Sequence, residues 1–225
     1  MIAQTREPQY QSCLEIKQTR GLTPLGLMSN QVWQDDPRRL VFLLARYKFV
    51  SKMLSGKRSV LEIGCADAFG TRIVLQEVGS VTAVDFDPVF VQDARERMDP
   101  EWEFEVKSHD MLSGPVPPGG FDAAYSMDVI EHILPKDEHT FVGNIASSLT
   151  EDGVLILGSP SIHSQAYASK PSLEGHVNCK DAAGMRKLTE KHFRNVFLFS
   201  MNDELVHTGF TPMAHYLIAM CVGRK

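Results

Sequence analysis

The stretch Val60–Thr71, VLEIGCADAFGT, decides the fold. A short apolar run from Ser59 to Ile63 ends at Gly64, and small residues then lead into a helical pattern that starts at Gly70. This is the order of a buried strand, a tight turn and a helix. Small side chains let the backbone of such a turn approach a ligand, and the helix start offers unpaired N–H groups. The segment therefore predicts a ligand-binding turn at the edge of an α/β sheet.

Strands and helices alternate along most of the remaining chain. Strand patterns occupy residues 59–63, 81–85, 102–106, 121–126 and 153–157. Helical patterns occupy residues 37–54, 70–78 and 88–98, the segment from the fourth strand to residue 149, and residues 181–192. Two last runs, 195–199 and 215–222, have no helix between them and predict an antiparallel hairpin. The alternation indicates a mostly parallel sheet with both faces covered.

An acid follows the second strand, at Asp85. An acid at this place can accept hydrogen bonds from the ribose hydroxyls of a nucleotide. The turn reads G-x-A-x-A-x-G over residues 64–70, which does not fit the dinucleotide fingerprint G-x-G-x-x-G. Glu62 within the first strand would repel a pyrophosphate and attract an ammonium group. These residues favour a cationic, phosphate-free ligand, and the two alanines predict a backbone that avoids left-handed angles.

These residues resemble the first motif of class I S-adenosylmethionine-dependent methyltransferases. Asp110 in its HDM step, residues 121–133 (FDAAYSMDVIEHI) and residues 149–160 (LTEDGVLILGSP) are similar to the later motifs of that family. The resemblance implies an α/β, Rossmann-like sheet of seven strands in the order 3-2-1-4-5-7-6, with strand 7 antiparallel and helices on both faces. It also implies a methyltransferase domain over residues 56–225 and an N-terminal helical cap over residues 1–55.

The resemblance further implies S-adenosylmethionine as cofactor. It places the methionine end at Glu62 and the turn, the ribose at Asp85 and the adenine at Asp110. Cys65 would contribute its backbone. The expected cofactor-binding residues are Glu62, Gly64, Cys65, Ala66, Phe69, Gly70, Asp85, Phe86, Asp110, Met111 and Met127.

The string Asp128-Val-Ile-Glu131-His132 predicts a metal site. At a helix start, positions i, i+3 and i+4 share a face, which would bring two carboxylates and an imidazole together. The string is similar to E-x-x-E-H in the ubiquinone-pathway O-methyltransferases and the plant small-RNA 2′-O-methyltransferases. That resemblance adds His176 of EGHVN as a fourth ligand of Mg²⁺ or another divalent cation. Two alternatives stay open: His132 or His176 as a metal-free catalytic base, or a structural role for these residues.

The expected reaction is O-methylation of a small hydroxylated molecule, with a sugar, a sugar-nucleotide or another metabolite as acceptor. One alternative is 2′-O-methylation of an RNA terminus, which the metal motif suggests. The net charge of −5 argues against a nucleic-acid partner. A second alternative is a nicotinamide-binding oxidoreductase, against which Glu62 and the missing fingerprint argue. A third is a non-catalytic cofactor-binding or regulatory module, which intact motifs do not exclude.

Composition limits the setting in which the chain works. Among its 225 residues no apolar stretch approaches the length of about 20 residues that spans a membrane. Its N-terminus lacks the apolar core of a signal peptide, and its four cysteines are scattered without a C-x-x-C pair. We therefore expect a cytoplasmic protein with reduced thiols and no membrane partner. The sequence predicts no particular oligomeric state.

Overall fold

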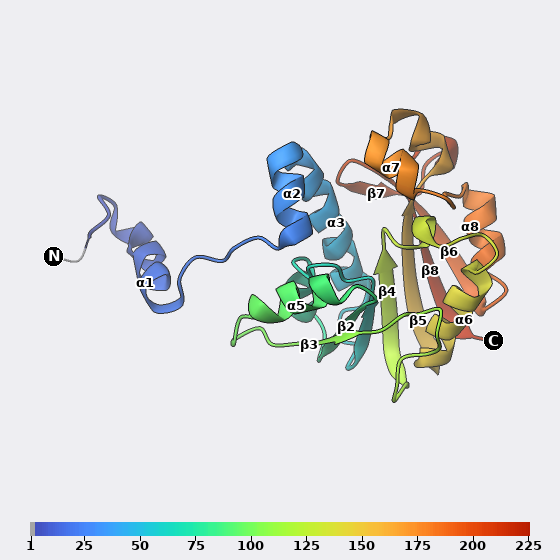
Figure 1. Ribbon diagram of the computed structural model, residues 1–225, viewed down its shortest axis with the longest axis horizontal. Coiled ribbons are helices and arrows are strands. Elements are labelled where there is room, and N and C mark those ends of the chain that lie inside the picture. The colour runs from blue at the N-terminus through green and yellow to red at the C-terminus, as the bar shows by residue number, and fades with distance from the viewer. Residues whose placement is uncertain (1–2) are drawn as a thin grey trace.

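One sheet forms the centre of the computed structural model, which describes residues 3–225 (Figure 1). Within these residues the sheet has eight strands in the order β3-β2-β1-β4-β5-β8-β6-β7. The strands are β1 (Val60–Ile63), β2 (Val81–Asp85), β3 (Glu105–Ser108), β4 (Phe121–Met127), β5 (Leu149–Pro160), β6 (Phe193–Asn202), β7 (Leu205–His207) and β8 (Tyr216–Arg224). Strands β1 to β5 are parallel to one another, and β8 runs antiparallel to both β5 and β6.

The predicted strand order is confirmed, with β8 as the reversed last strand, but the predicted count of seven is wrong. The segment between the last two predicted strands forms the short additional strand β7, which pairs with the end of β6. Asp203 has a φ of +50° and lets the chain turn back after β6. Strand β7 has only three residues and pairs with β6 only because the chain turns back, so its sequence shows no strand pattern.

Helices cover both faces of the sheet. Tyr47 and Val50 of α3 (Pro37–Met53) and Val74 of α4 (Thr71–Leu75) pack on one face. Residues of α6 (Glu138–Ser148) and α8 (Ala182–Thr189), among them Phe141 and Met185, pack on the other. The remaining helices are α1 (Gln11–Arg20), α2 (Leu27–Asp35), α5 (Pro88–Glu96) and α7 (Lys170–Gly175). No helix within residues 3–225 has the length and apolarity needed to cross a bilayer.

Local sequence explains where several elements begin and end. The carboxylate of Asp36 accepts a hydrogen bond from the amide of Arg38 at 3.2 Å, and Pro37 occupies the first helical position, so α3 begins as predicted. The helix expected after the fourth strand is shorter than predicted. Only a 3₁₀ turn, Ile130–His132, precedes α6, and Pro135 lies between them. Strand β3 begins later than predicted because a turn links the amide of Trp102 to the carbonyl of Asp99.

The N-terminal residues divide into two parts. Helix α1 stands away from the sheet, joined to α2 by an extended segment (Figure 1), and none of its ten residues is buried. Arg20 at its end forms ion pairs with Asp99 at 2.7 Å and with Glu101 at 2.8 Å. Helix α2 packs against α3, which itself lies on the sheet. The packed part of this region is therefore the α2–α3 pair.

Candidate active site

The turn after β1 has a strained backbone. Gly64 has a φ of +73°, and a Cβ there would lie 2.2 Å from Cγ2 of Val129, so glycine is required. The prediction for the two alanines is wrong, since φ is +46° at Ala66 and +52° at Ala68. Hydrogen bonds hold both in the left-handed region. The amide of Ala66 donates to Asp85 Oδ2 at 2.8 Å, and that of Ala68 donates to the Cys65 carbonyl at 2.7 Å.

Asp85 lies at the end of β2 and is buried. Its Oδ2 accepts the amide of Ala66, and its Oδ1 accepts the amide of Asp87 at 2.9 Å. A carboxylate has about four lone-pair positions, so each oxygen can accept a further hydrogen bond. Asp85 therefore shapes the turn and can still bind a hydroxyl group.

A cavity of about 590 Å³ lies along the carboxyl ends of β1, β2 and β4. This size lies within the range typical of small-molecule pockets. Eight of the predicted site residues line the cavity, namely Gly64, Ala66, Asp85, Phe86, Asp110, Met111, Asp128 and His132. The sequence did not identify Met28 of α2 or His109 as lining residues, because no motif or spacing connects either to the turn.

Glu62 lies beneath the turn and does not line this cavity. It accepts hydrogen bonds from the hydroxyl of Tyr47 at 2.9 Å and from that of Thr71 at 2.5 Å. Burial raises the pKa of Glu62 to about 7. Gly70 leaves the space that the Tyr47 ring occupies, since a Cβ there would lie 2.5 Å from the ring. These four residues support the turn from below.

Three other predicted cofactor residues also lie outside the cavity lining. Cys65 is buried, and burial raises the pKa of its thiol. Phe69 borders a separate, smaller cavity. The sulfur of Met127 accepts a hydrogen bond from the Tyr216 hydroxyl at 3.7 Å. These three side chains therefore do not line the cavity that holds the other predicted residues.

Three of the four predicted metal ligands come together. Glu131, His132 and His176 each place a ligand atom within 4.8 Å of the others, the one such cluster among the described residues. Asp128 does not join them, which corrects the assumption of a shared helix face. Its φ of +58° turns it away before the 3₁₀ turn begins, and its carboxylate pairs with Arg46 of α3 at 2.5 Å.

Glu131 has an unusual environment. It is only 1% exposed, and neither carboxylate oxygen has a hydrogen-bond partner within residues 3–225. Burial raises the pKa of Glu131 well above its ordinary value, and the nearby charge of Asp128 raises it further. A buried carboxylate without a partner is costly, and a cation would satisfy both oxygens. The donor set of one carboxylate and two imidazoles fits a divalent metal ion.

Both histidines are oriented in the way that metal ligands are. His132 Nδ1 lies 2.9 Å from the carbonyl of Gly175, which can only accept, so Nδ1 carries the proton. His176 Nδ1 lies 2.8 Å from Oε1 of Gln165, whose amide nitrogen donates to the Ser161 carbonyl. Each ring therefore keeps a lone pair on Nε2, the arrangement that outer partners impose on ligating histidines. Burial lowers the pKa of His176, which favours its neutral form.

Backbone hydrogen bonds join the loop of His176 to the turn of Glu131. The amides of Val177 and Asn178 donate to the Glu131 carbonyl at 2.8 and 3.0 Å. The loop after β5 is therefore fixed onto the turn after β4. No sequence signal pointed to Gly175 or Arg46, because both act through partners that are distant along the chain.

Comparisons with known proteins identify relatives of this chain. Residues 60–153 match a family model described as a methyltransferase domain. A Mycobacterium tuberculosis protein described as a probable S-adenosylmethionine-dependent methyltransferase is 31% identical over 104 residues, which cover 46% of this chain and 36% of that protein. The ubiquinone biosynthesis O-methyltransferase of Xanthomonas campestris pv. campestris is 28% identical over 160 residues, which cover 65% of this chain and 63% of that protein. The chain thus spans about a third of the length of the first of these relatives.

A solved structure shares the fold. The N-methyltransferase NodS of Bradyrhizobium japonicum WM9, in complex with S-adenosyl-L-homocysteine, superposes with a TM-score of 0.63. The superposition covers 85% of this chain and 90% of that chain at 18% sequence identity. At this identity the likeness establishes the fold alone.

Proposed function

Because the chain belongs to the class I S-adenosylmethionine-dependent methyltransferases, we propose that it transfers a methyl group to a hydroxyl of a small molecule with the help of a divalent metal ion. The observation that carries the proposal is the buried, unpartnered carboxylate of Glu131 beside two histidines, one of which, His132, lines the cavity. The similarity to ubiquinone biosynthesis O-methyltransferases supports oxygen as the methylated atom.

The cavity supplies groups for each part of S-adenosylmethionine. Asp85 can accept hydrogen bonds from the ribose hydroxyls, and Phe86 and Met111 offer apolar surface for the adenine. Gly64 and Ala66 expose backbone at the turn, where the methionine end can approach closely. Glu62 acts beneath the turn, through Tyr47 and Thr71.

The metal would be held by Glu131, His132 and His176. Its chemistry is Lewis-acid polarisation of the acceptor oxygen, which lowers the pKa of the hydroxyl proton. Gly175 and Gln165 hold the two imidazoles in the required tautomer. His132 is exposed and also lines the cavity, so an acceptor bound beside it would lie next to the cofactor pocket. The arrangement can hold acceptor and methyl donor in one geometry, which lowers the entropic barrier to transfer.

The test combines metal binding with turnover. Purified protein is incubated with S-adenosylmethionine and a panel of catechols, sugars and sugar-nucleotides, and formation of S-adenosylhomocysteine is measured with Mn²⁺ and with chelator. We expect chelator to abolish turnover. Mn²⁺ calorimetry should show at least a tenfold loss of affinity in Glu131→Gln and in His176→Ala, because each removes one of three ligands.

Glu174→Gln is the matched control, since Glu174 is exposed on α7, next to Gly175. This variant should bind Mn²⁺ like the wild type. Without metal, Glu131→Gln should be at least as stable as the wild type because it removes a buried, unpaired carboxylate. That result would separate loss of metal from loss of fold. Full turnover in chelator would overturn the metal role and leave His132 or His176 as a metal-free base.

A further inference from the structure

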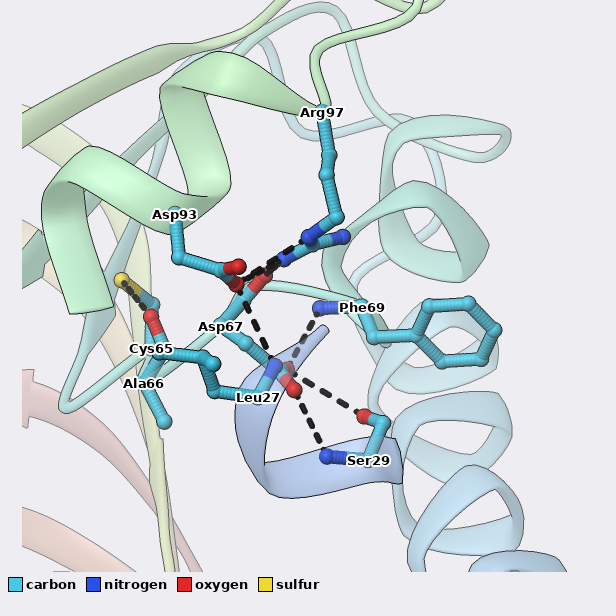
Figure 2. A network of polar contacts seen from close by, with 8 residues as sticks. All are labelled: Leu27, Ser29, Cys65, Ala66, Asp67, Phe69, Asp93 and Arg97. Carbon is cyan, nitrogen blue, oxygen red and sulfur yellow. Dashed lines mark hydrogen bonds and ion pairs between the residues drawn. The ribbon is translucent and has the colours of Figure 1, made fainter. Parts of the chain in front are cut away.

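Carboxylates from other elements hold the first turn of α2. The amide of Leu27 donates to Asp93 Oδ2 at 3.3 Å, and the amide of Ser29 donates to Asp67 Oδ2 at 2.7 Å (Figure 2). The Ser29 hydroxyl also donates to Asp67 Oδ1 at 3.2 Å. The N-cap residue, Gly26, provides no side-chain cap. Two of the amides that are free at a helix start, those of Leu27 and Ser29, are therefore bonded to carboxylates outside α2.

Asp67 belongs at the same time to the turn after β1. It lies between Ala66 and Ala68, whose backbones are left-handed, and its Oδ1 also accepts the amide of Phe69 at 3.1 Å. Its carbonyl accepts a hydrogen bond from Arg97, and the same guanidinium binds Asp93 at 3.0 and 2.7 Å (Figure 2). One network therefore joins α5 and α2 to the turn after β1, residues 64–70, which we call the cofactor turn.

The contact between α2 and the turn leaves no spare space. A Cβ on Gly26 would lie 2.4 Å from Cβ of Asp67 and 2.4 Å from Nη2 of Arg97. Asp67 is 5% exposed and Ser29 is 1% exposed, so water competes little for their hydrogen bonds. Met28, between the two bonded residues of α2, lines the 590 Å³ cavity.

We infer that Asp67 is a positioning residue that couples the docking of α2 to the conformation of the cofactor turn. Left-handed backbone is unfavourable for alanine and persists only where surrounding contacts enforce it. Docked α2 supplies such contacts through Asp67 and thereby keeps the turn in shape for the cofactor. Because coupling between two equilibria is reciprocal, bound cofactor in turn favours docked α2. This inference rests on the cofactor pocket described under the proposed function.

Calorimetry with S-adenosylhomocysteine tests the coupling. Ser29→Ala removes one donor to Asp67 and replaces no residue of the turn or of the cavity lining, and it should weaken binding by about fivefold or more. Asp67→Asn should weaken binding further. Ser51→Ala is the matched control, because Ser51 is also buried but donates only to the Lys48 carbonyl within α3. Its affinity should stay within about twofold of the wild type.

Hydrogen exchange of the wild-type protein provides a second readout that needs no variant. Saturating S-adenosylhomocysteine should slow the exchange of the amides of residues 27–35. Wild-type affinity in both Ser29→Ala and Asp67→Asn, together with unchanged exchange in α2, would overturn the inference and leave the proposed function intact. A wild-type protein that binds no S-adenosylhomocysteine would overturn the proposed function and the inference with it.

Discussion

Glu62 shows how one side chain connects the cofactor turn to the helices around it. Tyr47 of α3 and Thr71 of α4 both donate to its buried carboxyl group. Burial raises its pKa from 4.5 to about 7, so between these values the folded protein holds a proton that the unfolded chain releases. The folded state therefore loses stability as the pH rises from 4.5 to 7.

Glu62→Gln should remove this part of the pH dependence. A pKa shift of this size corresponds to a fall of up to roughly 3 kcal/mol in the free energy of unfolding across the interval. The variant keeps an acceptor oxygen but cannot titrate, so its curve should be flatter than that of the wild type. Urea unfolding at several pH values between 4.5 and 7 measures the difference. Parallel curves for the two proteins would contradict the shifted pKa.

Some site residues could be predicted from sequence because they lie at the end of a strand or in the turn that follows it. Asp85 and Glu131 are of this kind, since the position of a strand fixes where the next residues lie. The role of Asp128 could not be predicted, because its partner Arg46 is 82 positions away. The left-handed alanines could not be predicted either. Their conformation is imposed by contacts from Asp85 and the Cys65 carbonyl, and local propensity alone argues against it.

Among the elements, long patterns were predicted better than short ones. Helix α3 begins where its sequence predicts, and a strand forms at each pattern of the parallel sheet, but β3 and β5 begin at other residues than predicted. The 3₁₀ turn at Ile130–His132 and strand β7 span three residues each, too few for a periodic pattern. Their existence depends on pairing and packing with segments far along the chain.

Helix α1 contributes little to the folded domain. None of its residues is buried, and exposed ion pairs such as Arg20–Asp99 stabilise by at most about 1 kcal/mol. Removal of residues 1–21 should therefore change the melting temperature by less than about 4 °C. Removal of residues 1–36 also deletes α2 and should weaken binding of S-adenosylhomocysteine. Differential scanning fluorimetry and calorimetry measure both. A large loss of stability in the shorter deletion would show that α1 packs on the domain.

At the scale of the whole molecule, cofactor binding should be visible as stabilisation. S-adenosylhomocysteine at a hundredfold excess over its Kd adds about 2.7 kcal/mol, which raises the melting temperature of a chain this long by about 5–10 °C. NAD should cause no shift, because the turn lacks the dinucleotide fingerprint. Asp85→Asn should reduce the shift by weakening the ribose contacts. An equal shift with NAD would contradict the cofactor assignment, and an unchanged shift in Asp85→Asn would contradict the role of Asp85.

The position of β8 has a consequence for how the chain acquires its structure during synthesis. This strand comes last of the eight along the chain, yet it lies inside the sheet between β5 and β6, pairing with both. Until residues 216–224 have left the ribosome, β5 has an unpaired edge and β6 has no place in the sheet. A nascent chain can assemble β1 to β5 early, but it closes the sheet only after β8 has been synthesised.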